Sequence, residues 1–439
     1  MSSFSRSIIL TFFGLLTITT AFAQPKTNSP YSRFGLGDVL DQRFAAYQVT
    51  GFNNAYHDYF HLNMHNPASL GHLTSTAFEV ALYSQRSNWE SGGAENTNWS
   101  GNLNYLALGF PLNNPINQVL DRDVKKFNWG MAFNLQPYTL VGYDVETIGT
   151  IAEVGGTTTR FRGTGGTYKA QWGNGFKYKN LSAGLNLGYV FGRIESNRNI
   201  FFNDLVGGYE NRLTDDFSIK GIIWNFGAQY DFFIKTKDTR FQKSVTIGAT
   251  ANSSHSIDTN TSQFYERFNI QYIIPQDTIL STTNLRGGGT IPGAFGFGMV
   301  YTQANKLKVG FNYDYTAWSA YRNDAKDERL KDSWRLSAGA EFTPDYSSYN
   351  RYGKKIRYQL GVFYGKDPRS IGGEQINQVG ASFGFGLPLT LPRQQVSFIN
   401  FAFEFGQNGG NTTITETYGR LTVGFTLNDN SWFFKRKFN

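Results

Sequence analysis

Four of the five histidines of this 439-residue chain lie close together, at His57, His61, His65 and His72. The first three are four residues apart, a spacing that on a helix would place three imidazoles along one face. Imidazole is a good ligand for zinc, copper or nickel. However, Asp58 is the only carboxylate nearby, and no H-E-x-x-H pattern is present. We therefore favour histidines that hydrogen-bond to surrounding protein over a metal site, for which His57, His61 and His65 are weak candidates.

Covalent chemistry has little support elsewhere in the chain. There is no cysteine, no G-x-S-x-G pattern, and the one further histidine is His255. The glycine-rich stretch 286–289 lacks the Lys-Ser/Thr pair that completes a phosphate-binding loop. We predict that the protein is not an enzyme and needs no cofactor.

Composition narrows the class of protein further. Charged residues make up 17% of the chain, below the roughly 25% of soluble domains, whereas aromatics reach 16% and there are 48 glycines. The formal net charge is +8. A nucleic-acid-binding protein would cluster its Lys and Arg residues, but here they are spread between the apolar segments. No nucleic-acid partner is expected.

Residues 1–23 have the features of a secretory signal. Arg6 precedes an apolar stretch over 8–18, and Ala21-Phe22-Ala23 forms an A-x-A cleavage site. The apolar run is shorter than the about 20 residues of a membrane-spanning helix, and no later window is apolar enough to form one. We predict that residues 1–23 are cleaved from an exported bacterial protein.

A period of two dominates the rest of the chain. Over 307–315, Leu, Val, Phe, Tyr and Tyr alternate with Lys, Gly, Asn and Asp, which is the pattern of a strand with one apolar and one polar face. Such segments are about 10 residues or longer, the length that a tilted strand needs to cross a bilayer, whereas soluble strands average about 5–6. Aromatic residues lie at segment ends, as in interfacial girdles. The pattern predicts an all-β fold, a transmembrane antiparallel β-barrel, because closed barrels satisfy every backbone group in lipid.

We predict about fourteen strands within a barrel that spans 76–427. They are expected at 76–86, 101–110, 127–138, 166–178, 181–194, 217–234, 242–251, 293–303, 306–318, 332–342, 356–365, 376–387, 395–406 and 415–427. Residues 428–439 would be a C-terminal periplasmic tail or the end of the last strand. The predicted extracellular loops are 87–100, 139–165, 195–216, 252–292, 319–331, 366–375 and 407–414, since outer loops are longer than periplasmic turns. The segment 264–274, a candidate extra strand, is assigned to the longest loop, and 111–126 is a candidate for a short helix.

Residues 24–75 do not alternate and are too few for a stable domain. Their apolar content, including Phe34, Phe44, Tyr47 and Leu62, predicts burial in the lumen as an N-terminal plug, or hatch, because wide barrels are often plugged. The alternative is a periplasmic tail.

Four charged residues fall on the polar face of their strands: Asp314, Glu341, Arg335 and Glu404. A charge on the lipid face costs several kcal/mol near the midplane, so these side chains should point into the lumen. Their expected role is a network that holds the plug, and the alternative is selectivity toward a permeating molecule.

Several stretches resemble the FadL-type outer-membrane transporters of hydrophobic compounds. TGFNNAYHDYFHLNMHNPASLGHL (50–73) resembles that family's plug signature, ending in Asn66, Pro67 and Ala68. IPGAFGFGMVYTQANKLKVGFNYDYTAWSAY (291–321) is similar to its strand–turn–strand with a D-Y-x-x-W-S end, and RYQLGVFYGKDPRSIGGEQINQVGASFGFGLPL (357–389) to its late hairpin. SPYSRFGLGD (29–38) resembles the start of outer-membrane proteins of the Bacteroidota.

This resemblance implies a fourteen-strand barrel in the bacterial outer membrane with a hatch that contains Asn66, Pro67 and Ala68. It implies that a hydrophobic, fatty-acid-like small molecule enters from an outer-loop site and leaves sideways through an opening in the wall. Outer-membrane lipid and lipopolysaccharide would surround the barrel, and other envelope proteins are further candidate partners. Two alternatives stay open: a non-catalytic structural subunit of an outer-membrane secretion or assembly complex, and a general diffusion porin.

Overall fold

The computed structural model of the protein describes residues 27–113, 126–152, 155–204, 209–235, 242–269, 274–390 and 395–429. The predicted signal sequence, most of the candidate helix at 111–126 and the chain end beyond residue 429 lie outside these residues. Within them, no helix is both long and apolar enough to cross a membrane.

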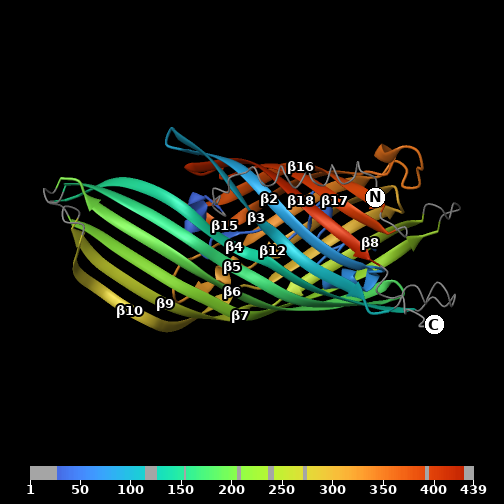
Figure 1. Ribbon diagram of the computed structural model, residues 1–439, viewed down its shortest axis with the longest axis horizontal. Helices are drawn as coiled ribbons and strands as arrows, with labels where there is room; N and C mark the ends of the chain where they lie inside the picture. The colour runs from blue at the N-terminus through green and yellow to red at the C-terminus, as the bar shows by residue number, and fades with distance from the viewer. Residues whose placement is uncertain are drawn as a thin grey trace, which may run out of the picture.

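Fourteen antiparallel strands form a closed ring (Figure 1). Their order around the ring is β2 (Thr76–Ser91), β3 (Ala94–Pro111), β4 (Phe127–Ile151), β5 (Gly155–Tyr178), β6 (Leu181–Phe202), β7 (Tyr209–Ile234), β8 (Lys243–Asn252), β11 (Ala294–Gln303), β12 (Leu307–Thr316), β14 (Ser333–Phe342), β15 (Arg357–Ile371), β16 (Glu374–Thr390), β17 (Val396–Asn408) and β18 (Ile414–Asp429). The ring closes where β18 pairs with β2, from Ile414 opposite Ser91 to Asp429 opposite Thr76. The predicted transmembrane barrel and its fourteen strands are confirmed.

The two faces of the wall differ as the alternation predicts. In β12, Val309 and Phe311 are 43% and 38% exposed on the outer face. The side chain of Asn312, on the inner face, is fully buried. Exposed Phe, Leu, Trp and Tyr side chains recur on the outer face of the other barrel strands. An apolar belt around a closed ring, which leaves no backbone edge unpaired, is the outer surface expected of a barrel that spans a membrane.

Several strands run far beyond the membrane-crossing length, and here the predicted loops were wrong. The segments 139–165, 195–216 and 252–292 are mostly strand, as are 87–100 and 366–375. The latter two are hairpins whose tips, Gly92-Gly93 and Gly372-Gly373, have positive φ at both residues, as tight two-residue turns require. Only 319–331 and 407–414 are mainly non-strand among the predicted loops that the structure describes. The first of these loops contains the end of η4 (Trp318–Ala320) and the two-residue strand β13 (Arg322–Asn323).

Two strands outside the ring, β9 (His255–Asn269) and β10 (Ile274–Ile291), enlarge this region. β9 pairs with β10 and with the first half of β7, while β8 pairs with the second half of β7. Residues 264–269 therefore belong to β9 and residue 274 to β10, rather than to a loop. We call β9, β10 and the adjoining halves of β4–β7 the sheet extension; it forms the left-hand end of Figure 1.

The sheet extension packs on an apolar core. Ile194, Phe217, Ile219 and Ile257 of the extension form one buried cluster with Trp318, Tyr321, Leu36 of the N-terminal part of the chain and other residues. The alternation in the sequence does not indicate this core, because Thr, Asn and Gly occupy many of the positions between these apolar side chains. The alternation rule assigns these strands to loops for that reason.

Residues 27–75, which we call the inner segment, lie inside the ring. They contain η1 (Pro30–Arg33), β1 (Asp38–Val39), α2 (Ala45–Gln48) and η2 (Pro67–His72). Phe44, Tyr47 and Leu62 are fully buried. Strands on opposite parts of the ring hydrogen-bond to the segment, among them β6, β7, β12, β15 and β16. A short η5 (Tyr352–Lys354) lies between β14 and β15.

The facing of the wall can be tested on one strand. Leu82 lies six residues after Thr76, where β2 begins, and is 55% exposed. At about 3.3 Å per residue and a tilt of about 45° it is near the bilayer midplane. Leu82→Lys should cost about 2–4 kcal/mol of stability. Gln85→Lys, on the inner face, loses the hydrogen bond from Arg420 but places its ammonium beside Glu416, so it should cost less than Leu82→Lys does. The measurement is the folded fraction on a heat-modifiability gel across a urea series, and equal midpoints for the two variants would contradict the assignment.

Candidate functional site

Glycines on the inner face of the wall mark where the backbone of the inner segment touches the strands. A Cβ added to Gly248 would overlap the carbonyl of Asn54, and one added to Gly361 would overlap that of Val49. The same holds for other glycines that face the segment's backbone: Gly130, Gly175, Gly184 and Gly339. The glycine-rich face that the sequence suggested as a polar barrel interior is therefore the surface on which the backbone of the segment packs closely. We call these six glycines the glycine seat.

Asn66, Pro67 and Ala68 form the start of η2 on this seat. The Asn66 side chain accepts a hydrogen bond from the Ala68 amide at 3.1 Å, which caps the helix. Pro67 at the first helical position needs no amide partner. The Pro67 backbone lies against Gly175 and Gly184 of β5 and β6. The motif thus positions the end of the inner segment against the wall.

The histidines at 57, 61 and 65 are not on a helix, so the expected stacking along one face is wrong. Asn63 explains why: its side chain accepts from the His65 and Asn66 amides and donates to the carbonyls of Asn53 and Tyr56. These bonds replace a helical ladder. Each histidine instead faces a carboxylate on a different strand: His57–Asp231 at 3.2 Å, His61–Glu79 at 3.5 Å and His65–Asp314 at 3.5 Å.

The four charged residues singled out on the strands all face the inner segment or its surroundings. Asp314 accepts hydrogen bonds from Asn53 and Asn54 of the segment at 3.0 and 2.8 Å. Glu341 pairs with Lys308 at 3.2 Å. The other two lie together: the Arg335 guanidinium is 4.0 Å from Glu404 and covers the Phe363 ring at 3.8 Å.

A buried ion network in the inner segment was not found from the sequence. Arg43, which is 4% exposed, donates to both carboxylate oxygens of Asp41 at 2.7 Å and lies 3.6 Å from Glu404. Burial alone would raise the pKa of Asp41, but the Arg43 guanidinium lowers it below its ordinary value. Because both residues come from an irregular segment, no periodicity in the sequence could have indicated them.

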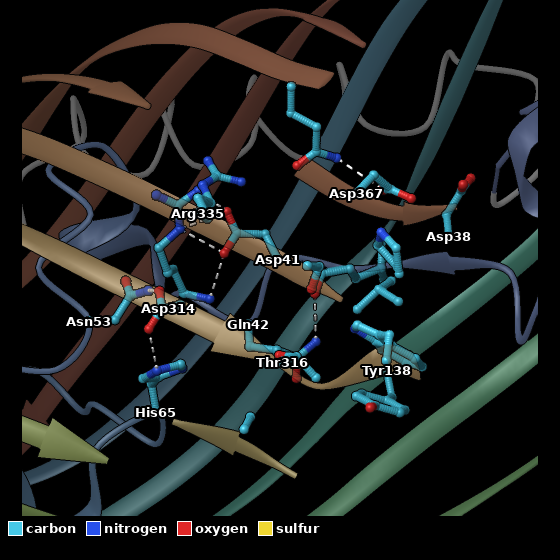
Figure 2. A pocket seen from close by; sticks show the side chains of 18 of the residues that line it. Asp38, Asp41, Gln42, Asn53, His65, Tyr138, Asp314, Thr316, Arg335 and Asp367 are labelled. Atoms are coloured by element: carbon cyan, nitrogen blue, oxygen red, sulfur yellow. Dashed lines mark hydrogen bonds and ion pairs between the residues drawn. The ribbon is translucent and has the colours of Figure 1, made fainter. Parts of the chain in front are cut away.

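A cavity of about 420 Å3 lies between the inner segment and the wall. Figure 2 shows Asp41, Gln42 and Asn53 of the segment around it, with Arg335 and Tyr138 from the strands and the Asp314–His65 pair. Its lining is strongly charged and includes these further residues: Lys169, Lys366, Asp367, Arg369, Glu416 and Arg420. The cavity can hold a small molecule, and its lining offers hydrogen bonds and both signs of charge.

The wall beside this cavity is parted between β3 and β4. These strands pair only from Leu106 opposite Leu135 to Pro111 opposite Gly130, although both continue much further. Pro137 lies just above the last pair, at a register shift in β4, and proline cannot donate a ladder hydrogen bond. We call this the β3–β4 opening.

The beginning of the inner segment fills the β3–β4 opening. Strand β1 pairs with β4, with Asp38 opposite Leu140 and Val39 opposite Thr139. The Ser29 amide donates to the Gly142 carbonyl at 2.8 Å. On the β3 side, the Asn98 side chain donates to the carbonyl of Asn28 at 3.0 Å. Few backbone bonds therefore separate the cavity from the outside of the wall.

An apolar groove lies on the outer face next to the opening. It is lined mainly by large apolar side chains of β2–β6: Phe78, Leu106, Leu108, Phe133, Leu135, Trp172, Leu187 and Tyr189. Asn134 and Gln171 line it as well, and Gln171 also lines the cavity. The groove and the cavity thus approach each other at the same part of the wall.

Comparison with known proteins gives one family and one fold. The model of a protein family described as BamG matches residues 5–439. No curated protein matches the chain in sequence. Three solved structures resemble it: the toluene transporter TbuX of Ralstonia pickettii (12% identity, 88% of this chain and 98% of that chain, TM-score 0.52), the toluene transporter TodX of Pseudomonas putida (13%, 90% and 99%, 0.52) and a FadL homologue of Pseudomonas aeruginosa (11%, 86% and 97%, 0.50).

At these identities the likeness establishes the fold, and the FadL-type barrel suggested by the sequence motifs is confirmed. Barrels of this kind span the bacterial outer membrane, and the chain is such a barrel. Two of the three similar structures are named as toluene transporters.

The glycine seat generates a prediction for the inner segment. Gly248→Ala should push the backbone at Asn54 off the wall, because a Cβ has no room there, and should lower the unfolding midpoint and increase current fluctuations of single channels in planar bilayers. Gly149→Ala is the control: its nearest neighbour would be Thr157 Oγ1 at 3.6 Å, an ordinary contact. Equal midpoints and equally quiet recordings for both variants would show that the segment does not depend on this seat.

Proposed function

Because the chain belongs to the BamG family and has the FadL-type fold, we propose that it passes hydrophobic small molecules across the outer membrane. The observation that carries this proposal is the β3–β4 opening, where a short stretch of the inner segment separates an internal cavity from an apolar groove on the outer face. A molecule that reaches the cavity could leave sideways into the membrane without crossing the rest of the segment.

In this proposal, residues 1–23 are removed, residues 24–75 are the hatch, and the barrel from residue 76 carries the path, with 428–439 as its periplasmic end. The sheet extension faces the outside of the cell, because outer loops are the longer ones in such barrels. Lipid and lipopolysaccharide surround the apolar belt. Asn66, Pro67 and Ala68 hold the hatch in place, and Asp314, Glu341, Arg335 and Glu404 tie it to the wall.

At the opening the hatch is held to β4 mainly by hydrogen bonds. Strand β1 contributes two residue pairs, and the Ser29 and Leu40 amides donate to the carbonyls of Gly142 and Tyr138. Each such bond contributes about 0.5–1.5 kcal/mol net. An ion pair between Asp38 and Arg369 adds to them. The sideways route requires residues 27–40 to leave these partners, so they are the part that has to move.

The lining favours an amphipathic molecule. Two of the similar structures are named as transporters of toluene, a hydrocarbon without a polar group. In contrast, the cavity of this protein is lined by Lys169, Lys366 and Arg420 together with carboxylates. A buried charge without a partner is costly, so a molecule with an apolar body and a polar end, such as a fatty acid, fits the cavity and the groove together better than toluene does.

A second function is favoured by a different observation. The glycine seat and the Arg43 network hold most of the hatch rigidly, which suits a non-catalytic structural subunit of an outer-membrane secretion or assembly complex. Native mass spectrometry of the protein extracted from its own host in mild detergent separates the two. A lone barrel with a lipid-like bound mass supports transport, and a stoichiometric complex with other envelope proteins supports the structural subunit.

The chain has no cysteine, so the opening can be locked with an engineered pair. Val39 and Thr139 are directly opposed in β1 and β4, within the span of a disulfide. Oxidised Val39→Cys/Thr139→Cys should lose at least about tenfold in uptake of radiolabelled oleate, and dithiothreitol should restore it, because the lock holds residues 27–40 in the opening. The measurement is the initial uptake rate in cells that express the barrel.

The matched control is Tyr301→Cys/Val309→Cys, an opposed pair in the β11–β12 hairpin that is on the outer face, where Val309 is exposed, and is remote from the opening in the ring order. Oxidation there should leave uptake unchanged. Full uptake with the locked opening would refute the sideways route. Absence of oleate uptake in the reduced variant and in the unmodified protein would refute transport of this class of molecule and favour the structural subunit.

A further inference from the structure

Two histidines of the inner segment and one aspartate of the wall converge near the turn between β5 and β6. His57 Nε2 lies 3.2 Å from Asp231 Oδ1, and the His57 and His72 rings stack at 3.9 Å. One donor atom from each of the three side chains lies within 4.8 Å of the other two. This cluster is at the opposite end of the inner segment from the β3–β4 opening.

A second layer of hydrogen bonds orients these donors. His72 Nε2 is 2.9 Å from Ser182 Oγ of β6, which leaves Nδ1 directed toward the cluster. Asp231 Oδ1 accepts from the hydroxyl of Thr246 on β8 at 2.7 Å. Outer partners of this kind fix the ring orientation of metal-binding histidines and the carboxylates beside them. Four elements of the wall and segment therefore cooperate to hold three potential ligands.

The cluster already surrounds a positive charge. Lys177 of β5 places its ammonium 3.0 Å from His72 Nδ1 and 3.4 Å from Asp231 Oδ2. Its side chain is 18% exposed, so it has access to water and can swing aside on its flexible stem. The donors of the cluster thus point at a site for a cation, which the lysine supplies in this arrangement.

We propose that this cluster binds a divalent transition-metal ion, best matched by Zn2+, which displaces the ammonium of Lys177. Two imidazole nitrogens and one carboxylate oxygen are a ligand set that zinc accepts, with water in the fourth position. Bond lengths of about 2.0–2.2 Å place tetrahedral ligand atoms about 3.3–3.5 Å apart. His57 Nε2 and Asp231 Oδ1, 3.2 Å apart, already have about this spacing. The widest separation in the cluster, at most 4.8 Å, has to close by up to about 1.4 Å, which a rotation of the half-buried His57 side chain can provide.

Such an ion would link two points of the inner segment, His57 and His72, to one point of the wall, Asp231. His57 and His72 lie on either side of the Asn66 cap, and Asp231 is near the end of β7. A metal that bridges them would hold residues 57–72 more firmly without touching residues 27–40. This inference stands apart from the proposed function, since it concerns the attachment of the segment whether or not a molecule passes the opening.

The site also differs from the histidine grouping that the sequence suggested. His61 and His65 are directed to Glu79 and Asp314 on other strands, so only His57 of the three candidates takes part. Its partner His72 comes from η2, 15 positions along the chain. Spacing in the sequence could not indicate a pair that the bends of the inner segment bring together.

Zinc binding can be measured on the full chain purified in detergent without a histidine tag, by isothermal titration after treatment with a chelator. We expect one Zn2+ per chain in the unmodified protein. His57→Gln and His72→Gln should each weaken binding about tenfold or more, because each removes a ligand. Lys177→Met should bind more tightly than the unmodified protein, because no ammonium has to leave. His65→Gln is the matched control and should bind as the unmodified protein does.

Co2+ adds a spectroscopic readout, since tetrahedral coordination by nitrogen and oxygen gives visible absorption that the His57→Gln variant should lack. His57 is partly exposed, so this variant should fold, and a heat-modifiability gel checks each preparation. Absence of Zn2+ binding to the unmodified protein would overturn the proposal and leave Lys177 as the permanent cation. Equal affinities of the unmodified protein and His57→Gln, or an affinity of Lys177→Met that is not increased, would also overturn it.

Discussion

The close approach of the inner segment's backbone to the wall is the constraint on which the rest of the structure depends. A ring of fourteen strands encloses more space than its own side chains fill, and residues 27–75 occupy that space. They are irregular over most of their length, so their amides and carbonyls need partners that no helix or sheet supplies. Glycines such as Gly248 and Gly361 let the backbone approach, and inward-facing Asn and Gln side chains such as Asn312 and Gln359 complete its hydrogen bonds.

Charge inside the barrel follows from the same constraint. Side chains such as Asp314 and Glu404 cannot point into lipid, and in the lumen they would be desolvated by the segment that fills it. Each is therefore matched by a group of the segment: Asn53 and His65 for Asp314, and Arg43 for Glu404. Pairing of this kind makes the segment and the wall specific for each other. It also leaves charged side chains around the cavity that lies between them.

The period of two was enough to predict the barrel strands, because lipid outside and close packing inside impose opposite demands on alternate residues. It failed in the sheet extension, where Thr, Asn and Gly occur on either face, so the alternation assigns β9 and β10 to a loop. It failed also in the inner segment. There the path of the chain is set by single side chains such as Asn63, and the partners His57 and His72 meet only after several bends.

The attachments of the inner segment are distributed unevenly, and this bears on what can move. Residues 50–72 are seated on glycines of several strands and tied by three histidine–carboxylate contacts, so displacing them would break many contacts at once. Residues 27–40 are held at the β3–β4 opening by a two-residue strand and a few further bonds, although Arg369 and Asp38 form an ion pair there. Because the free energies of local opening follow the number of buried contacts that are lost, the balance between these two sets of contacts decides which part of the segment yields first. The parted strands β3 and β4 are bridged by residues 27–40, so the strength of the wall at this place depends on contacts of the inner segment and not on the strand ladder of the barrel.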